Sequence, residues 1–353
     1  NFDAGLQLTI GGKLQLEAFG VVQAFGSFQL TTRVQDIADG AGNVITDAQV
    51  LIFTLTDVTM IAGTGFAPWA DIAVNQTVLG TGGAGFVMEG ASLELAVVLR
   101  SADIATNRPE LTWVALAASV DIVTARGLSN DDSIVFVFSD LSVLINQPSG
   151  DVADPLANVR LDWATIALFD GRMVSQITDT IQVQFGGAVT INIDGVVLLA
   201  GSLAGSIESF AAAGVDDKAP PAGTVGDVTV MTFGISDVFL FAGADGAFAT
   251  QLIDGENTIV GFADQGIGFK IENLNIDLAI VVEDAPRVAG AVVQSWTALY
   301  GSATTVTPVG LPDGLVMTVN NLIVGYNGFS KPDAVNSIVA TQLDWAAICL
   351  LYT

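Results

Sequence analysis

One apolar stretch occurs four times in this chain, and this repetition constrains the fold more than any other feature. Its longest form is Ile134–Ile145, IVFVFSDLSVLI, and its other copies are Ile52–Ile61 (IFTLTDVTMI), Thr232–Phe241 (TFGISDVFLF) and Val316–Tyr326 (VMTVNNLIVGY). The four copies align without gaps when one central polar residue of each is placed in register: Asp57, Asp140, Asp237 and Asn321. Apolar residues alternate on both sides of this position, and alternation is the pattern of a β-strand.

The alternation changes phase at the central residue. In the longest copy, Phe136 and Phe138 stand before the polar pair, whereas Leu141 and Val143 follow it one residue out of phase. A slip of one residue moves the apolar side chains to the other face of the strand. A β-bulge or a corner between sheets produces such a slip. We therefore predict a structural role, and not a ligand site, for the four repeat positions Asp57, Asp140, Asp237 and Asn321.

Longer phrases also recur, which indicates a tandem duplication. Gly85–Leu99 resembles Gly268–Val282, and Arg160–Phe169 (RLDWATIALF) resembles Gln342–Leu351 (QLDWAAICLL). Each copy contains two related halves, because Asp140 follows Asp57 by 83 residues and Asn321 follows Asp237 by 84. The sequence predicts two β-rich copies, residues 1–183 and 184–353, stacked as a sandwich or solenoid-like array with continuous sheets.

Turn residues indicate how the strands connect. Pairs such as Asp194-Gly195 and Asp245-Gly246 favour tight hairpins, so we expect mainly antiparallel pairing. No window has the periodicity of a helix, and Arg160–Phe169 is interpreted as the apolar strand that closes the first copy. The predicted fold class is all-β.

Composition restricts the classes of function. Apolar residues make up 51% of the chain and charged residues only 14%, so strand faces must be buried within the chain or against neighbouring copies. No apolar run is long enough for a membrane-spanning helix. The net charge of -26 argues against nucleic-acid partners. With a single cysteine, Cys349, the chain has no disulfide framework or zinc cluster.

An enzyme is the least favoured class. Histidine is absent, so catalysis would require paired carboxylates such as Glu89 with Glu94, or Glu272 with Asp277. Both pairs lie in stretches that otherwise alternate as strands, and we predict no catalytic residues.

Calcium is the only metal that the sequence suggests. Asp36, Asp39, Asn43 and Asp47 place several oxygen ligands in one Gly-rich loop, which suits Ca²⁺. An ordinary Asp/Gly turn explains the same residues more simply. No other cofactor is expected.

Four tryptophans stand at equivalent points of the two copies. Trp113 and Trp296 lie in matching strands, and Trp163 and Trp345 in the Leu-Asp-Trp phrases. Stacking on sugar rings is one interpretation of the second pair. Packing anchors between modules are favoured over it.

The phrases TWVAL, SDLSVLINQPSGD and LDWATI resemble the tandem-repeat regions of very large, repetitive bacterial surface or secreted proteins of the adhesin type. The resemblance implies an extracellular or cell-surface location, a structural or adhesive role, and a parent polypeptide that is longer than this chain.

The leading hypothesis is a structural module of an extracellular filament, sheath or giant adhesin. It would extend by β-sheet continuation, with itself or neighbouring repeats as partner, through terminal strands at Leu8–Leu16 and Leu343–Leu350. A calcium- or glycan-binding adhesion module is the alternative. A transmembrane β-barrel is less favoured, because the apolar phase slips within the strands.

Overall fold

A computed structural model gives the fold of most of the chain. It describes residues 6–18, 21–39, 42, 44–66, 79–102, 109–128, 134–150, 154, 156–210, 228–253, 256–263, 265–283, 293–310 and 318–329. Of the residues singled out above, Asn43, Trp345, Cys349 and Leu343–Leu350 lie outside these ranges.

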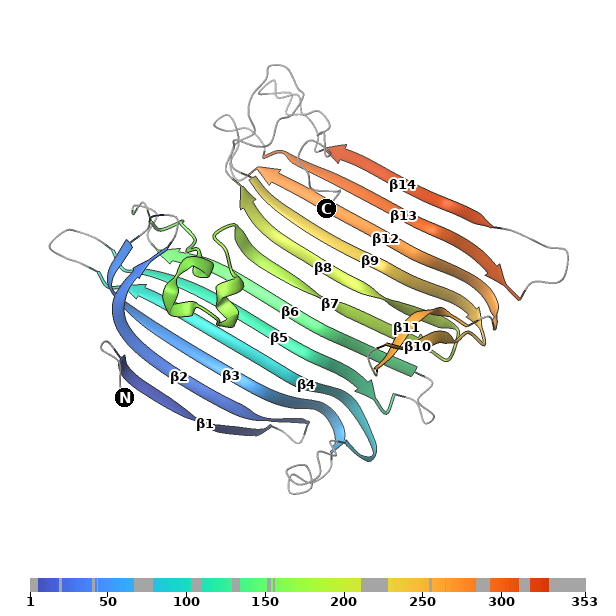
Figure 1. Cartoon of the computed structure of the whole chain (residues 1–353), viewed down its shortest axis with the longest axis horizontal. Coiled ribbons are helices and arrows are strands. Elements are labelled where there is room, and N and C mark those ends of the chain that lie inside the picture. The colour runs from blue at the N-terminus through green and yellow to red at the C-terminus, as the bar shows by residue number, and fades with distance from the viewer. Residues whose placement is uncertain are drawn as a thin grey trace, which may run out of the picture. The chain divides into compact units, whose positions relative to one another are not determined.

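Twelve strands form one open sheet, and each strand lies beside the next one in the order β1–β9, β12, β13, β14 (Figure 1). Their bounds are β1 Leu6–Ala18, β2 Val22–Ala38, β3 Val44–Phe66, β4 Leu79–Arg100, β5 Leu111–Arg126, β6 Ile134–Gly150, β7 Ile181–Ile193, β8 Val197–Phe210, β9 Val228–Ala244, β12 Ile267–Glu283, β13 Ser295–Val309 and β14 Val319–Phe329. A separate hairpin consists of β10 Phe248–Ile253 and β11 Glu256–Phe262.

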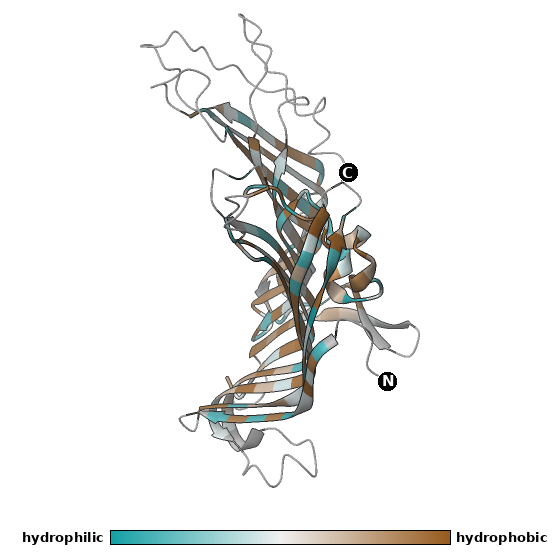
Figure 2. Cartoon of the chain, turned by 90° about the vertical axis from the view of Figure 1, so that its left-hand side faces the viewer, coloured by the Kyte–Doolittle hydropathy of each residue, from teal (hydrophilic) through white to brown (hydrophobic). Residues whose placement is uncertain are grey.

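The predicted all-β class with mainly antiparallel pairing is confirmed. Figure 2 shows hydrophobic and hydrophilic residues following one another along the strands that face the viewer, as alternation in the sequence requires. The turn between β7 and β8 has left-handed backbone at Asp194 (φ 50°) and Gly195 (φ 62°), which is the geometry of a type I′ hairpin turn. The finer prediction of a stacked sandwich or solenoid is not confirmed by the described strands.

The chain divides into two compact units, Asn1–Gly187 and Ala188–Thr353, and the division falls within β7. Some local contacts recur in both units. The Gly63 amide donates to the Val21 carbonyl at 2.8 Å in the first unit, and the Gly243 amide donates to the Val196 carbonyl at 2.8 Å in the second. Val196 stands 175 residues after Val21, as Gly195 does after Gly20.

The core of the first unit lies between the sheet and the long connection from β6 to β7. Alanines on β3, β4 and β5 are fully buried and leave room for large rings above them: Ala48, Ala96, Ala115 and Ala117. The rings of Trp113, Trp163 and Phe169 fill that room, each at most 1% exposed. Small residues below and aromatic residues above give the dense packing that a core needs.

The prediction of a strand at Arg160–Phe169 is wrong. This part of the connection forms two single 3₁₀ turns, η1 (Trp163–Thr165) and η2 (Ala167–Phe169). They are followed by η3 (Met173–Gln176), which packs against β4 and β5 (Figure 1). In the two single turns, the apolar residues Trp163, Ile166 and Phe169 are buried and three positions apart, and the buried Leu161 precedes them. A spacing of three places side chains on one side of a 3₁₀ turn, whereas a strand would require a spacing of two.

The second unit has a smaller aromatic core. Here the hairpin β10–β11 packs on β8 and β9, and its Phe262 ring lies 6.0 Å from that of Phe241 and 5.9 Å from that of Phe248. Leu198 and Phe241 are at most 1% exposed beneath the hairpin. Aromatic contacts therefore hold this hairpin on the sheet.

All four repeat positions have left-handed backbone, with φ between 52° and 54° at Asp57, Asp140, Asp237 and Asn321. Asp and Asn are the residues other than glycine that most readily adopt this conformation. The pairing register shifts at two of them. Between β2 and β3 it shifts beside Asp57, and between β8 and β9 it shifts beside Asp237. These shifts are β-bulges, in which one strand has an extra residue.

The left-handed backbone at Asp140 predicts how substitutions there affect stability. Asp140→Gly should change the free energy of unfolding by less than about 1 kcal/mol, since glycine adopts positive φ readily. Asp140→Val should lower it by about 1–2 kcal/mol, because a β-branched residue is strained in this conformation. Urea denaturation measures both. The control Ser142→Val, at an exposed position of the same strand, should have little effect; equal losses at the two positions would contradict this account of Asp140.

Candidate functional site

Two of the carboxylates considered for catalysis, Glu94 and Glu272, make structural contacts. Glu94 is 3% exposed, and its carboxylate accepts the Met173 amide at 3.0 Å and a nitrogen of Arg172 at 3.4 Å. These contacts fix the turn η3 on β4. In the second unit, Glu272 forms an ion pair with Lys270 at 3.5 Å, and burial raises the pKa of the Asp277 carboxyl.

The candidate calcium ligands meet across β2 and β3. One carboxylate oxygen of Asp36 accepts the Asp47 amide at 2.8 Å, where Asp47 has φ 50° and the strand register shifts. Asp39 is 7% exposed, and Asn43 lies outside the described residues. Within the described ranges, no group of three or more His, Cys, Asp or Glu side chains is placed to hold a metal ion. Asp36 thus satisfies a bulge amide that the sheet leaves unpaired.

The described tryptophans are buried. Trp113 donates its ring N–H to the Val159 carbonyl at 2.9 Å, and Trp163 packs against Phe169 with ring centroids 5.1 Å apart. Trp296 is also fully buried, and Trp345 lies outside the described residues. Trp113 and Trp163 anchor the β6–β7 connection to the sheet of their own unit. This position differs from the predicted anchor between modules.

The side chain of Asn146, a residue of β6, forms hydrogen bonds to the connection between β6 and β7. Its amide group donates to the Leu161 carbonyl at 3.0 Å and to the Thr178 carbonyl at 2.9 Å, and its oxygen accepts the ring N–H of Trp163 at 3.0 Å. The side chain is 0% exposed. One buried amide therefore satisfies three polar groups that water cannot reach.

The edges of the sheet are the part of the molecule that is suited to binding. Among the described strands, β1 and β14 each have a neighbour on one side only, and the other side of such an edge strand is where a further strand can pair. On β1 the large apolar side chains are 37–49% exposed, and on β14 they are 39–62% exposed. They are Leu8, Ile10, Leu14 and Leu16 on β1, and Val319, Leu322, Ile323, Val324, Tyr326 and Phe329 on β14.

The interior strand β7 shows how exposed the matching apolar side chains are when a strand has a neighbour on both sides. β1 (LQLTIGGKLQLEA) aligns without gaps to β7 (IQVQFGGAVTINI), which stands 175 residues later. The β7 residues that match the exposed ones of β1 are half-buried: Val183, Phe185, Val189 and Ile191. Apolar residues that are covered in the middle of the sheet are thus exposed at its edge.

Two glycine pairs were missed as site residues in the sequence. Gly11-Gly12 in β1 matches Gly186-Gly187 in β7. The ungapped match of these two strands is the sequence signal by which the glycine pairs could have been found. Its meaning depends on the contact between Gly187 and β6, which only the structure reveals.

Comparisons of the chain with protein-family models, with curated proteins and with solved structures gave no match. In the described ranges there is also no helix with the length and hydropathy needed to cross a bilayer.

The role of Asn146 predicts a large loss of stability on truncation. Asn146→Ala leaves the Trp163 N–H and two carbonyl groups without partners in a dry core, at a cost of about 1–3 kcal/mol for each group. We expect the free energy of unfolding to fall by at least about 2 kcal/mol, measured by chemical denaturation. The adjacent exposed residue supplies the control, Gln147→Ala, which should be nearly neutral. A loss no larger than that of the control would show that the amide is not needed.

The buried carboxyl of Asp162 predicts a pH dependence. Burial raises its pKa, repulsion from Asp179 adds to the shift, and the Ala164 amide opposes it. Because the folded pKa lies above that of the unfolded chain, the stability contributed by Asp162 is present at acid pH and is lost as pH rises through the folded pKa.

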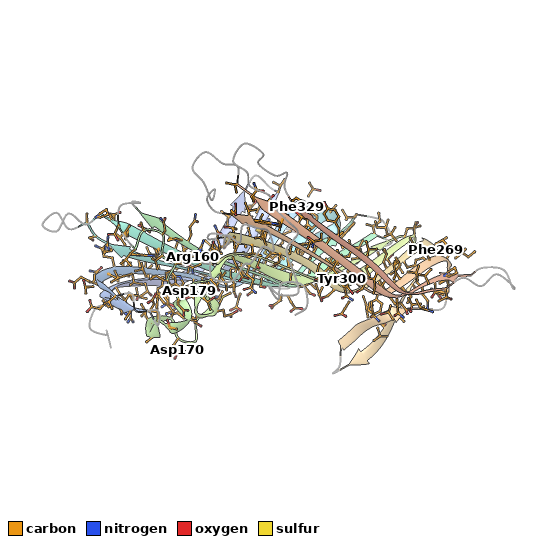
Figure 3. The ribbon with its side chains drawn as sticks, turned by 90° about the horizontal axis from the view of Figure 1, so that it is seen from above. Arg160, Asp170, Asp179, Phe269, Tyr300 and Phe329 are labelled. Atoms are coloured by element: carbon orange, nitrogen blue, oxygen red, sulfur yellow. The ribbon has the colours of Figure 1, made fainter. Side chains whose placement is uncertain are left out.

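Asp162→Asn should therefore raise the melting temperature at neutral pH, and this gain should vanish as pH falls below the ordinary aspartate value of 3.8. Asp170 belongs to the same connection (Figure 3) and is exposed, so Asp170→Asn makes the same change in net charge without the burial. Melting curves recorded from neutral to acid pH compare the two variants. An equal rise in melting temperature for both variants would show that the effect comes from net charge and not from burial of Asp162.

Proposed function

We propose that this chain is a structural module of an extracellular filament, sheath or large surface adhesin. The module would act by extending a β-sheet from one module to the next. The observation that carries the proposal is the pair of exposed apolar edge strands, β1 and β14, at the two ends of the twelve-stranded order. An added strand would supply partners for their backbone groups and cover their side chains.

The charge and composition of the chain agree with assembly by this route. Only 14% of the residues are charged, whereas an isolated soluble domain has about a quarter. The net charge of -26 keeps separate copies apart at low ionic strength. Association through the edges is therefore favoured when salt screens this repulsion.

The proposal predicts concentration-dependent association through the edges. At raised ionic strength, light scattering of the purified chain should show a mass that grows with concentration, and negative-stain images should show end-to-end assemblies. Ile10→Lys should weaken this association by about tenfold or more, because lysine on an edge strand opposes strand addition.

Phe269→Lys is the control, because it adds the same charge at a side chain that is 49% exposed on the interior strand β12 (Figure 3). This variant should assemble like the unaltered chain. A chain that stays monomeric at every concentration, or equal weakening by both substitutions, would overturn the proposal.

A further inference from the structure

We propose that β14 of one copy of this chain binds β1 of a second copy, through the glycine contact that β7 makes with β6 and in the register that β2 and β3 have beside their bulge. The inference rests on the proposed assembly function, and it adds the partner, the strand pair and the residue that fixes the register. That residue is Gly12.

The contact between β6 and β7 is the template. These strands are neighbours in the sheet, and Gly187 of β7 lies against the left-handed residue Asp140 of β6. A Cβ atom on Gly187 would lie 2.6 Å from Cδ2 of Leu141 and 3.0 Å from the carbonyl oxygen of Ser139. The first distance is shorter than real Cβ contacts and the second is tighter than most, so a side chain here would force Leu141 and the backbone of β6 to shift, and the close approach favours glycine.

The same glycine recurs beside two other repeat positions. A Cβ on Gly26 of β2 would lie 2.8 Å from Cγ2 of Val58 and 3.2 Å from the Thr56 oxygen, on either side of Asp57. A Cβ on Gly201 of β8 would meet the side chain of Val238 at 2.6 Å and the Ser236 oxygen at 3.2 Å, on either side of Asp237. Three left-handed residues thus each have a glycine on the neighbouring strand, against the same two groups.

The fourth repeat position, Asn321 in β14, has no described strand beside it on the corresponding side. β13 pairs with β14 as β5 pairs with β6, since Ala303 lies opposite Leu322 and Val120 opposite Leu141. The free side of β14 therefore corresponds to the side on which β6 receives Gly187. In the strand order, no described strand follows β14 on that side.

Gly12 of a second copy can supply the missing glycine. It occupies in β1 the position of Gly187 in β7, within the ungapped match of these two strands. β1 is the first strand in the order and also has a free side. A second copy therefore offers to β14 the counterpart of the strand that already binds β6.

The register follows from β2 and β3, where the pairing around the bulge is known. Val22 lies opposite Ala62 and Ala24 opposite Met60, with Gly26 beside the bulge. When Gly12 is placed on Asn321 in the same way, the apolar residues of the two edges face one another in pairs. The resulting pairs are Ile10 with Val324 and Leu8 with Tyr326.

Exposure of these four residues supports the pairing. Leu8 and Ile10 are 47% and 46% exposed, and Val324 and Tyr326 are 51% and 60% exposed. Directly opposite side chains on neighbouring strands contact one another, so this register would cover all four.

Disulfide trapping tests the register. Both chains carry Cys349→Ala, which removes the native cysteine, and each then receives one new cysteine. Leu8→Cys mixed with Tyr326→Cys should cross-link at least about tenfold more than Leu8→Cys mixed with Val324→Cys. Directly opposite positions fit a disulfide, whereas positions displaced by two residues are too far apart. Leu8, Val324 and Tyr326 are all exposed, so their substitution by cysteine should leave folding intact. Equal trapping of both pairs, or preference for Val324, would overturn the register.

Substitution of Gly12 tests the close approach. Gly12→Val should abolish association in light scattering, because a side chain there cannot fit beside Leu322. Gly301→Val, on the interior strand β13, is the control; a Cβ there meets no atom closer than 3.9 Å, and association should persist. Melting curves establish that both variants fold. Assembly of Gly12→Val like the unaltered chain would overturn this inference while the proposed function stands, and failure of the unaltered chain to assemble would overturn both.

Discussion

The close approach of a glycine to a left-handed residue is the contact on which the sheet depends. An extra residue at Asp57 or Asp237 bends its strand, and the neighbouring strand can follow only if it has no side chain at that point. Gly26 and Gly201 meet this requirement. The phase slip in the apolar sequence pattern is caused by the same bulge, because side chains change face where the extra residue stands. One local backbone feature thus links the repeat, the strand pairing and the shape of each edge.

A second constraint is the satisfaction of polar groups under the long connection between β6 and β7. Its turns contribute carbonyl groups to a dry core, and Asn146 together with Glu94 binds the groups that the short 3₁₀ turns leave unpaired. These two polar side chains therefore position the tryptophans that fill the core. The buried carboxylate of Glu94 thus has a structural role.

Much of the fold could be predicted from the sequence, because alternation is a local signal. Alternation predicts the strand around Ile134–Ile145, and the Asp-Gly pair predicts the left-handed hairpin turn at Asp194-Gly195. The stretch Arg160–Phe169 was misread as a strand, since an apolar spacing of three becomes meaningful only when a sheet lies on one side of it. Gly12 was missed for a related reason. A glycine in a strand is ambiguous until its neighbour is known.

The sequence by itself determined that the chain is all-β, that its strands are interrupted by Asp or Asn at repeated positions, and that only 14% of its residues are charged. These properties follow from local periodicity, backbone preference and composition. Only the tertiary structure decided which strands are interior and which are edges, and therefore why Phe185 is half-buried while its counterpart Ile10 is exposed. The physical reason is that burial and backbone pairing are properties of neighbours, and neighbours are set by the sheet as a whole.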